Sequence, residues 1–334
     1  MLKMFAGVLA GVMMTGAVSA ATSVKFANDW KWEGPAAPLL MALDKGYYKS
    51  AGLDVTMDTG KGSLDAIPRV ASGTYQIGAA DINSLIKFRD KNPDLKVSAV
   101  MMLYNAPPFA IIGRKSLGVT GPKDLEGKIL GAPAPDGAYA QWKAFVKANG
   151  IDASKVTIEN VGFPVREPML AQGKVHAITG YSFSSFINLK SKGVAADDIS
   201  LILMRDYGLD LYGNVIIVNP KFAAENPDAV KAFVAQTIRG FQDAIANPEA
   251  AVKHVLNHND VAREAVELER FKMAIAQNIV TDEVRANGLG GVDMKRLARS
   301  IDQIADTYAF KSKPAPADVF DASFLPAQSE RMLK

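Results

Sequence analysis

Two tryptophans and two carboxylates stand close together near the start of the chain: Asp29, Trp30, Trp32 and Glu33. Indole rings stack on planar heterocycles or on cations, and carboxylates accept hydrogen bonds from ring and amino N–H groups. The cluster therefore suits a planar, nitrogen-bearing ligand. The alternative is that Trp30 packs in the core and that Glu33 is an ordinary charge in a first helical turn, where the helix dipole favours it.

A glycine-rich segment, Gly60-Lys61-Gly62-Ser63, follows an alternating strand pattern at 53–57. Backbone N–H groups at such a turn can meet a ligand where the next helix begins, which makes Gly60 and Ser63 candidates. The alternative is a plain turn with Ser63 capping the helix. The segment matches neither a dinucleotide fingerprint, because Asp65 occupies the third glycine position, nor a phosphate-binding P-loop.

Further candidates stand in loops that follow predicted strands or begin predicted helices. Asp81 ends a strand pattern and either accepts a ligand N–H or caps the following helix. Arg166 could bind an acid, or it could form a solvated pair with its neighbour Glu167. Tyrosines near chain crossings either line a cleft or pack with a wet hydroxyl. The additional candidates are Asp81, Tyr104, Asp136, Gly137, Phe163, Arg166, Glu167, Tyr181, Tyr207 and Tyr212.

No motif supports catalysis, a metal or a cofactor. His254 and His258 are four residues apart on a predicted helix, but no acidic third ligand has the local spacing of a metal motif, so we expect a solvated helix face. There is no nucleophile elbow. The chain has no cysteine, which excludes thiolate zinc sites, iron–sulfur clusters, disulfides and cysteine nucleophiles.

The composition is that of an ordinary globular protein. The chain has 334 residues, 49% of them hydrophobic, which excludes disorder and predicts roughly two domains at about 150 residues each. A net charge of +3 from 38 basic and 35 acidic residues is too balanced for a protein that binds nucleic acid through its phosphates.

Residues 1–20 have the layout of a cleavable secretory signal peptide. Lys3 precedes an uncharged run, and Val18-Ser19-Ala20 places small residues at a cleavage site. The alternative is a membrane anchor, but the run is diluted with glycine, serine and threonine. We expect a mature chain that begins near Ala21.

The elements that must position the candidates form a weak internal repeat. Residues 71–81 and 171–181 each combine a helix end at glycine, a short apolar strand and the start of another helix. Helical stretches at 38–49 and 138–149, each followed by glycine, precede matching strands at 53–57 and 156–158. The pattern predicts two α/β lobes, each with a mainly parallel sheet flanked by helices.

Two crossings between the lobes are expected near 104–109 and 207–213, each flanked by apolar strands. The first lobe would contain 21–108, the second lobe 109–207, and residues 208–334 would return to the first lobe. Amphipathic spacing predicts helices at 227–246, 248–257, 260–280 and 292–305 in this last part. Two lobes joined twice enclose a cleft, a common place for a small ligand.

Several motifs together resemble periplasmic solute-binding proteins of ABC importers, in the branch that includes sulfonate, nitrate and thiamine-pyrimidine-precursor binders. The motifs are Asn28-Asp29-Trp30, residues 42–48, Gly52-Leu53-Asp54-Val55, Ala71-Ser72-Gly73, residues 124–128 and residues 169–173. The resemblance covers residues 24–250. It implies a type II periplasmic binding protein fold, a monomer that closes on a small molecule in the periplasm, and an inner-membrane ABC permease as partner.

The resemblance implies a binding protein without enzymatic activity, cofactor or nucleic-acid partner. Eukaryotic relatives that make the thiamine pyrimidine rely on a cysteine-rich motif, which this chain lacks. Pyrimidine binders of the family often follow Asp-Trp with asparagine and histidine, whereas this chain has Lys31, Trp32, Glu33 and Ala36. The expected ligand is a thiamine-precursor-like pyrimidine, with an alkanesulfonate, taurine or nitrate as the alternative. A secreted enzyme or a sensor on the same fold is the alternative of another class.

Overall fold

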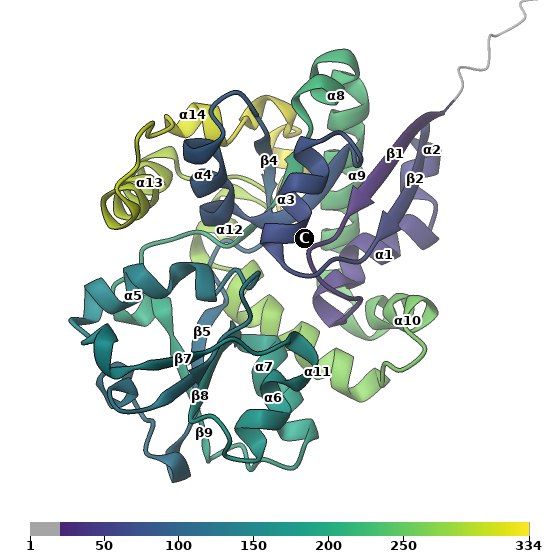
Figure 1. Cartoon of the computed structure of the whole chain (residues 1–334). Coiled ribbons are helices and arrows are strands. Elements are labelled where there is room, and N and C mark those ends of the chain that lie inside the picture. Colours follow the sequence, from purple (N-terminus) through teal and green to yellow (C-terminus); the bar gives the residue numbers. More distant parts are fainter. Residues whose placement is uncertain (1–20, 334) are drawn as a thin grey trace, which may run out of the picture.

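A computed structural model describes residues 21–333 and contains two five-stranded sheets (Figure 1). The predicted signal peptide lies outside the described residues. The first sheet has the order β2-β1-β3-β10-β4, and the second has the order β7-β6-β8-β5-β9. The strands of the first sheet are β1 (Thr22–Ala27), β2 (Leu53–Asp58), β3 (Ile77–Asp81), β4 (Ser98–Met102) and β10 (Asn214–Val218). Those of the second sheet are β5 (Phe109–Arg114), β6 (Ile129–Gly131), β7 (Thr157–Glu159), β8 (Ala177–Tyr181) and β9 (Ile199–Leu203).

The two sheets repeat one strand arrangement. In each sheet the first strand of the repeat lies between the second and the third, and one antiparallel strand separates the third from the fourth. That antiparallel strand, β10 or β5, is the first strand after the chain has crossed from the other sheet. The remaining strands of each sheet run in one direction. The prediction of two α/β lobes with mainly parallel sheets is confirmed, and the lobe boundaries stay a prediction.

Helices flank both sheets. We call the part packed around the first sheet the first lobe and the part packed around the second sheet the second lobe. Helices α5, α6 and α7 flank the second sheet, while α1, α3, α4 and α9 flank the first (Figure 1). The helices are α1 (Ala37–Asp44), α2 (Tyr47–Ser50), α3 (Ser63–Ala71), α4 (Ile82–Lys91), α5 (Trp142–Asn149), α6 (Phe163–Ala171), α7 (Ser182–Ser191), α8 (Pro220–Glu225), α9 (Pro227–Ala246), α10 (Pro248–His258), α11 (Glu264–Ala274), α12 (Asp282–Asn287), α13 (Met294–Tyr308), α14 (Pro316–Val319) and α15 (Gln328–Arg331).

Two predicted helices differ in the structure. The stretch at 38–49 is divided into α1 and α2, because Gly46 adopts a left-handed conformation with φ of 69° that stops the first helix. The stretch at 260–280 begins only at Glu264, and its last turn, Ile275–Ile279, is a π-helix. Helices α9 and α10 match their predicted ranges to within a residue.

The chain crosses between the lobes at two segments that lie side by side. The Leu103 and Tyr104 amides both donate to the carbonyl of Asn214, at 2.8 and 3.1 Å, and the Gly213 amide donates to the carbonyl of Tyr104 at 3.0 Å. Three hydrogen bonds between the two segments make them one paired unit, and their place between the sheets is that of a hinge.

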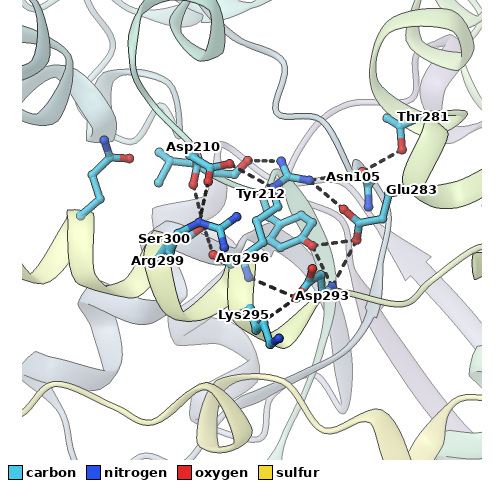
Figure 2. A network of polar contacts seen from close by, with 12 residues as sticks. Asn105, Asp210, Tyr212, Thr281, Glu283, Asp293, Lys295, Arg296, Arg299 and Ser300 are labelled. Atoms are coloured by element: carbon cyan, nitrogen blue, oxygen red, sulfur yellow. Dashed lines mark hydrogen bonds and ion pairs between the residues drawn. The ribbon is translucent and has the colours of Figure 1, made fainter.

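A polar network connects helix α13 to the return crossing at Leu211 and Tyr212 (Figure 2). The Arg296 guanidinium donates to the Leu211 carbonyl at 2.7 Å and to Glu283 Oε2 at 3.1 Å, and it lies over the ring of Tyr212. The Tyr212 hydroxyl donates to Glu283 Oε1 at 2.7 Å. This network stabilises the return crossing against the C-terminal part of the chain.

The lobes touch across the space between them. A Cβ added at Gly62, which begins α3, would lie 2.3 Å from the backbone oxygen of Pro135 in the second lobe. One added at Gly137, in the second lobe, would lie 3.4 Å from the Asp81 Cβ in the first. Contacts this close mean that the described conformation is closed. In residues 21–333 no helix has the length and apolar character required to cross a membrane.

We predict that Gly240→Ala destabilises the first lobe. Alanine favours a helix over glycine by about 1 kcal/mol, but a Cβ here would lie 2.4 Å from the backbone oxygen of Pro38, where α9 packs on α1. The clash should lower the free energy of unfolding by about 2 kcal/mol in a urea titration. Gly121→Ala, with no heavy atom within 4 Å of the added Cβ, is the matched control and should change it by less than about 0.5 kcal/mol. An unchanged Gly240→Ala midpoint would contradict the packing.

Candidate functional site

A cavity lies between the lobes, beside the hinge. About 770 Å³ of space free of protein atoms lies there, open solvent at its mouth included. The first lobe contributes the segment after β1, the start of α3 and the start of β10. The second lobe contributes the loop at 136–137, the start of α6 and the β8–α7 junction. The loops that carry the wall follow strands or begin helices, as predicted.

Asp29 is the central carboxylate of the wall. Its Oδ2 accepts a hydrogen bond from the Ser63 hydroxyl at 2.9 Å and another from Asn214 Nδ2 at 2.7 Å. Its Oδ1 has no hydrogen-bond partner among residues 21–333. Burial raises the pKa of Asp29 to about 6, against the opposing effect of its two donors, and the charge of Asp81 adds to the rise.

The glycine-rich turn holds Asp29 in place. The Gly62 amide donates to the backbone carbonyl of Asp29 at 2.7 Å, and Ser63 both donates to the Asp29 carboxylate and accepts from the Asp81 amide at 3.0 Å. Gly60 does not line the cavity. A Cβ there would lie 2.3 Å from the Asn28 carbonyl oxygen, so only glycine fits at this position. Its role is to let this turn approach the segment after β1.

Trp30 and Phe163 form the aromatic part of the wall, one ring from each lobe. Their ring centroids are 4.5 Å apart in an edge-to-face arrangement, and Lys31 Nζ lies 5.5 Å from the Trp30 ring. The Trp30 Nε1 atom is buried and has no hydrogen-bond partner within the described part of the chain. A buried donor without a partner in a cavity wall is a free recognition point for an acceptor.

The second lobe contributes a compact ionic cluster. Arg166 Nη2 donates to Glu167 Oε1 at 2.6 Å, and its Nη1 lies 4.0 Å from Asp136 Oδ2. Burial disfavours the guanidinium charge, but Glu167 and Asp136 outweigh it, so the pKa of Arg166 stays above its ordinary value. The sequence predicted either a ligand-binding cation or a solvated pair. The structure shows a buried pair, with Arg166 in the cavity wall and Glu167 behind it.

Asp136 is held by its own lobe. Its carboxylate accepts from the Thr179 hydroxyl at 2.8 Å and from the amides of Ala138 and Tyr139 at 3.3 Å. Burial nevertheless raises its pKa. Asp136 therefore caps the turn ahead of α5 and also lines the cavity with Gly137.

Glu33 joins the lobes at the opposite wall. Its Oε2 accepts from the Ser184 hydroxyl of α7 at 2.7 Å, and Arg270 Nη1 lies 3.6 Å from the same oxygen. Arg270 also donates to Glu267 Oε2 at 2.9 Å and to the Ser184 carbonyl at 3.1 Å. Burial among these partners makes Glu33 a structural carboxylate with a single exposed neighbour, Lys31, at 3.3 Å.

The remaining predicted residues lie outside the cavity wall. Trp32 is 8% exposed and packs in the core of the first lobe. Asp81 is fully buried as the N-cap of α4, accepting from the amides of Asn83 and Ser84, so that the capping alternative is correct. Tyr207 packs on Phe145 at the surface, and Tyr212 is held by Glu283 in the hinge network. The polar groups of Asp81 and Tyr212 are therefore already used within the fold.

Of the predicted residues, the structure brings ten together in the wall: Asp29, Trp30, Glu33, Ser63, Tyr104, Asp136, Gly137, Phe163, Arg166 and Tyr181. Burial raises the pKa of Tyr104 and that of Tyr181. The neighbouring carboxylates add to the rise, because they repel a phenolate.

The wall residues that the sequence analysis missed include Leu103 and Asn214 at the crossings and Phe183 and Ser184 on α7. Asn214 begins β10, directly after the crossing, and that position was the available signal. Arg270, which pairs with Glu33, and Glu267, which accepts from the Gly34 amide, are more than 230 residues away along the chain, and no local pattern points to them.

The two histidines of α10 lie at the surface, His258 exposed and His254 half-buried, and both are paired with an acid. His254 Nδ1 and His258 Nε2 both lie 2.8 Å from the carboxylate of Asp44 on α1 and staple the two helices. The residues that the structure describes hold no group of three or more histidines, cysteines and acids arranged to bind a metal ion.

A family model described as NMT1/THI5 like matches residues 35–251. The chain is 29% identical over 217 residues to the riboflavin-binding protein RibY of Chloroflexus aurantiacus, a match that spans 64% of this chain and only 60% of that protein. It is 26% identical over 242 residues to the formylaminopyrimidine-binding protein of Halalkalibacterium halodurans, over 72% of each chain. It is also 23% identical over 328 residues to a 4-amino-5-hydroxymethyl-2-methylpyrimidine phosphate synthase of Saccharomyces cerevisiae, over 93% of each chain.

Solved structures share the fold. The alkanesulfonate-binding protein SsuA of Xanthomonas axonopodis, bound to MOPS, superimposes with a TM-score of 0.68 at 12% identity, over 90% of this chain and 99% of that one. The periplasmic nitrate-binding protein NrtA of Synechocystis gives 0.68 at 14% identity, over 91% and 87%. The fold is that of periplasmic binding proteins, as predicted.

Asp29 should make stability depend on pH in an identifiable way. Its folded-state pKa of about 6 is above the ordinary 3.8, so the folded chain binds the proton more tightly. Its contribution to the free energy of unfolding is therefore present at low pH and is lost as pH rises from about 4 to about 6, on the order of 2 kcal/mol. Urea titrations across this range should show that Asp29→Asn removes this loss.

The control is Asp54→Asn, at an exposed position on β2. It should leave the pH dependence of the wild-type chain intact. Identical slopes for Asp29→Asn and the wild-type chain would mean that Asp29 is not buried as described.

Proposed function

The chain belongs to the NMT1/THI5-like family, and we propose that it is the substrate-binding component of an ABC importer that captures a small nitrogen-containing heterocycle, such as a thiamine pyrimidine precursor. One observation carries the proposal. In a cavity closed between two lobes, the free Oδ1 of Asp29 stands in the same wall as the unpartnered Nε1 of Trp30.

These two atoms select for a ligand with both donors and acceptors. A carboxylate oxygen accepts an amino or ring N–H, and an indole N–H donates to a ring nitrogen or a carbonyl oxygen. The rings of Trp30 and Phe163 add apolar area for a planar heterocycle, at about 0.5–1.5 kcal/mol per aromatic pair beyond burial. An aminopyrimidine offers all three features in one small molecule.

Charge argues against an anion such as a sulfonate or nitrate. Asp29, Glu33 and Asp136 line the cavity, and the positive charge of Arg166 is already balanced by Glu167 and Asp136. An anion would have to displace Arg166 from these partners inside a buried cluster, at a cost of several kcal/mol. The anion-binding names of the structural relatives therefore do not carry over to this cavity.

Relatives favour the same ligand class. The formylaminopyrimidine-binding protein is named for a pyrimidine, and RibY is named for riboflavin, a larger planar heterocycle. The yeast relative is named as a synthase, but this chain has no cysteine and its cavity shows no activated nucleophile. We therefore propose binding without catalysis.

The proposal extends to location and partner. A signal peptide at residues 1–20 would deliver the chain to the periplasm, where a monomer would exchange its ligand with an inner-membrane ABC permease. The structural neighbour NrtA is named as a periplasmic protein, which supports this location. In this proposal Asp29, Trp30, Phe163 and Arg166 contact the ligand, and Glu33 and Asp136 fix the walls.

A thermal-shift panel tests the ligand class. We expect 4-amino-5-hydroxymethyl-2-methylpyrimidine to stabilise the purified mature chain, since a ligand at 100 times its dissociation constant adds about 2.7 kcal/mol. Riboflavin tests the larger heterocycle, and taurine and nitrate test the anions. Asp29→Asn should weaken the pyrimidine at least tenfold, because a hydrogen bond to a charged group contributes about 1.5–3 kcal/mol. A shift with taurine alone would refute the heterocycle.

Lobe closure should follow binding. The hinge at the paired crossings lets the lobes separate, and ligand in the cavity joins Trp30 of one lobe to Phe163 of the other. Solution scattering should show a smaller radius of gyration at saturating ligand than in its absence. The control is a ligand titration of Asp29→Asn, whose decrease in radius of gyration should require at least tenfold more ligand than that of the wild-type chain. An unchanged wild-type profile at saturation would argue against closure.

A further inference from the structure

A chain of hydrogen bonds crosses from the second lobe to Asp29. The Tyr181 hydroxyl, at the end of β8, donates to Asn214 Oδ1 at 2.7 Å. Asn214 Nδ2, on the first strand after the hinge, donates to Asp29 Oδ2 at 2.7 Å. The second donor to that oxygen, Ser63, belongs to the first lobe like Asp29 itself. Tyr181 is therefore the only member of this chain that the second lobe supplies.

The Tyr181 hydroxyl can bind Asn214 because Tyr181, unlike Asp81 in the first lobe, does not cap the following helix. Asp81 and Tyr181 occupy equivalent places in the repeat, each at the end of the third strand of its sheet and at the N-cap of the next helix. Asp81 spends its carboxylate on capping α4, whereas the Tyr181 side chain makes no capping bond to α7. Its hydroxyl reaches across the cleft instead.

The direction of the bonds fixes the amide of Asn214. An asparagine amide has one acceptor and one donor end, and Tyr181 occupies the acceptor end. The donor end must then face Asp29 Oδ2, which together with Ser63 fills that oxygen and leaves Oδ1 for another donor. If the amide turned over, its oxygen would face the carboxylate and the negative charge of Asp29 would be disfavoured.

Resting on the function proposed above, we propose that Tyr181 and Asn214 are positioning residues. Closure of the second lobe brings the Tyr181 hydroxyl to Asn214, the oriented amide holds Asp29 as an ionised acceptor, and the cavity thereby selects ligands that donate an N–H. The open protein would lack this restraint, so selectivity is completed by closure and is not present in the first lobe alone.

Other charges face Asp29 and enter its titration. Asp81, at the start of α4, and the Tyr104 and Tyr181 phenols interact with it directly. Glu33, Lys31, Asp136 and Arg166 line the same cavity. Substitutions at Asn214 and Tyr181 leave all of these carboxylates and cations in place, so a change in the Asp29 titration reports the relay.

The experiment titrates the Asp29 carboxyl by carbon NMR in the mature chain closed by saturating 4-amino-5-hydroxymethyl-2-methylpyrimidine, with the ligand-free chain as the open reference. Asn214→Leu keeps the approximate size and removes the N–H donor without adding a charge, so the pKa of Asp29 should rise by at least one unit. Tyr181→Phe keeps the ring and removes the hydroxyl, so it should rise by a smaller but measurable amount. A residue that only fills space would give the wild-type value in both variants.

Closure itself needs a separate control. Tyr308→Phe removes another phenol bond between the lobes, from the Tyr308 hydroxyl to the Ala140 carbonyl at 2.5 Å, and should leave the Asp29 titration unchanged. Two further bonds, from Gln141 to Asp81 and from Ser184 to Glu33, hold the lobes together in every variant. A Tyr181→Phe chain with the wild-type Asp29 pKa, or an equal shift in Tyr308→Phe, would overturn the relay.

Ligand affinity gives the second readout. With 4-amino-5-hydroxymethyl-2-methylpyrimidine as the probe, Tyr181→Phe should weaken binding about threefold at pH 6.5, because a smaller fraction of Asp29 is ionised, and the difference should vanish by pH 8.5, where Asp29 is ionised in both chains. A pH-independent loss would mean that Tyr181 acts only by contact and would overturn its positioning role. If the wild-type chain bound no probe, the proposed function would fail and the relay with it, whereas a probe that binds with no shift of the Asp29 pKa in Tyr181→Phe would overturn the relay alone.

Discussion

The burial of one carboxylate between two lobes is the constraint on which the site depends. Asp29 lies where neither lobe alone can enclose it, and its negative charge is costly there unless donors converge on it. Ser63 and Asn214 supply those donors to one oxygen and leave the other free. Three elements contact this residue: the glycine turn at 60–62, the start of α3 and the hinge strand β10. Closing the second lobe over it adds Tyr181 and completes the cavity.

The same strand arrangement serves two purposes in the two lobes. In the first lobe the end of the third strand carries Asp81, which caps α4 and receives Gln141 of the second lobe. In the second lobe the equivalent Tyr181 is released from capping and reaches the hinge. The two equivalent positions thus differ in role, a helix cap in the first lobe and a contact with the hinge in the second, while the order of the strands is the same.

Paired charges give the cavity walls their rigidity. Arg166 is held by Glu167 and Asp136 in the second lobe, and Arg270 is held by Glu33 and Glu267 next to the first. Removing one partner from such a buried group would leave an uncompensated charge, so these clusters resist rearrangement on ligand entry. The polar atoms of the wall that have no hydrogen-bond partner among the residues that the structure describes include Asp29 Oδ1, the Trp30 N–H and the Tyr104 hydroxyl.

Local patterns in the sequence were enough to predict the two α/β lobes, the helices α9 and α10, and the loops that carry the wall, because strand alternation, helix periodicity and glycine stops act over a few residues. They also placed Asp29 and Trp30 at the site. They could not decide which polar groups are already used by the fold. Asp81 is committed to its cap, Tyr212 to Glu283 and Arg166 to a buried pair, while Asn214 and Arg270 enter from distant parts of the chain. Only the tertiary structure decides this, because a hydrogen bond or an ion pair depends on distance in space, and the partners here are separated by up to 237 residues.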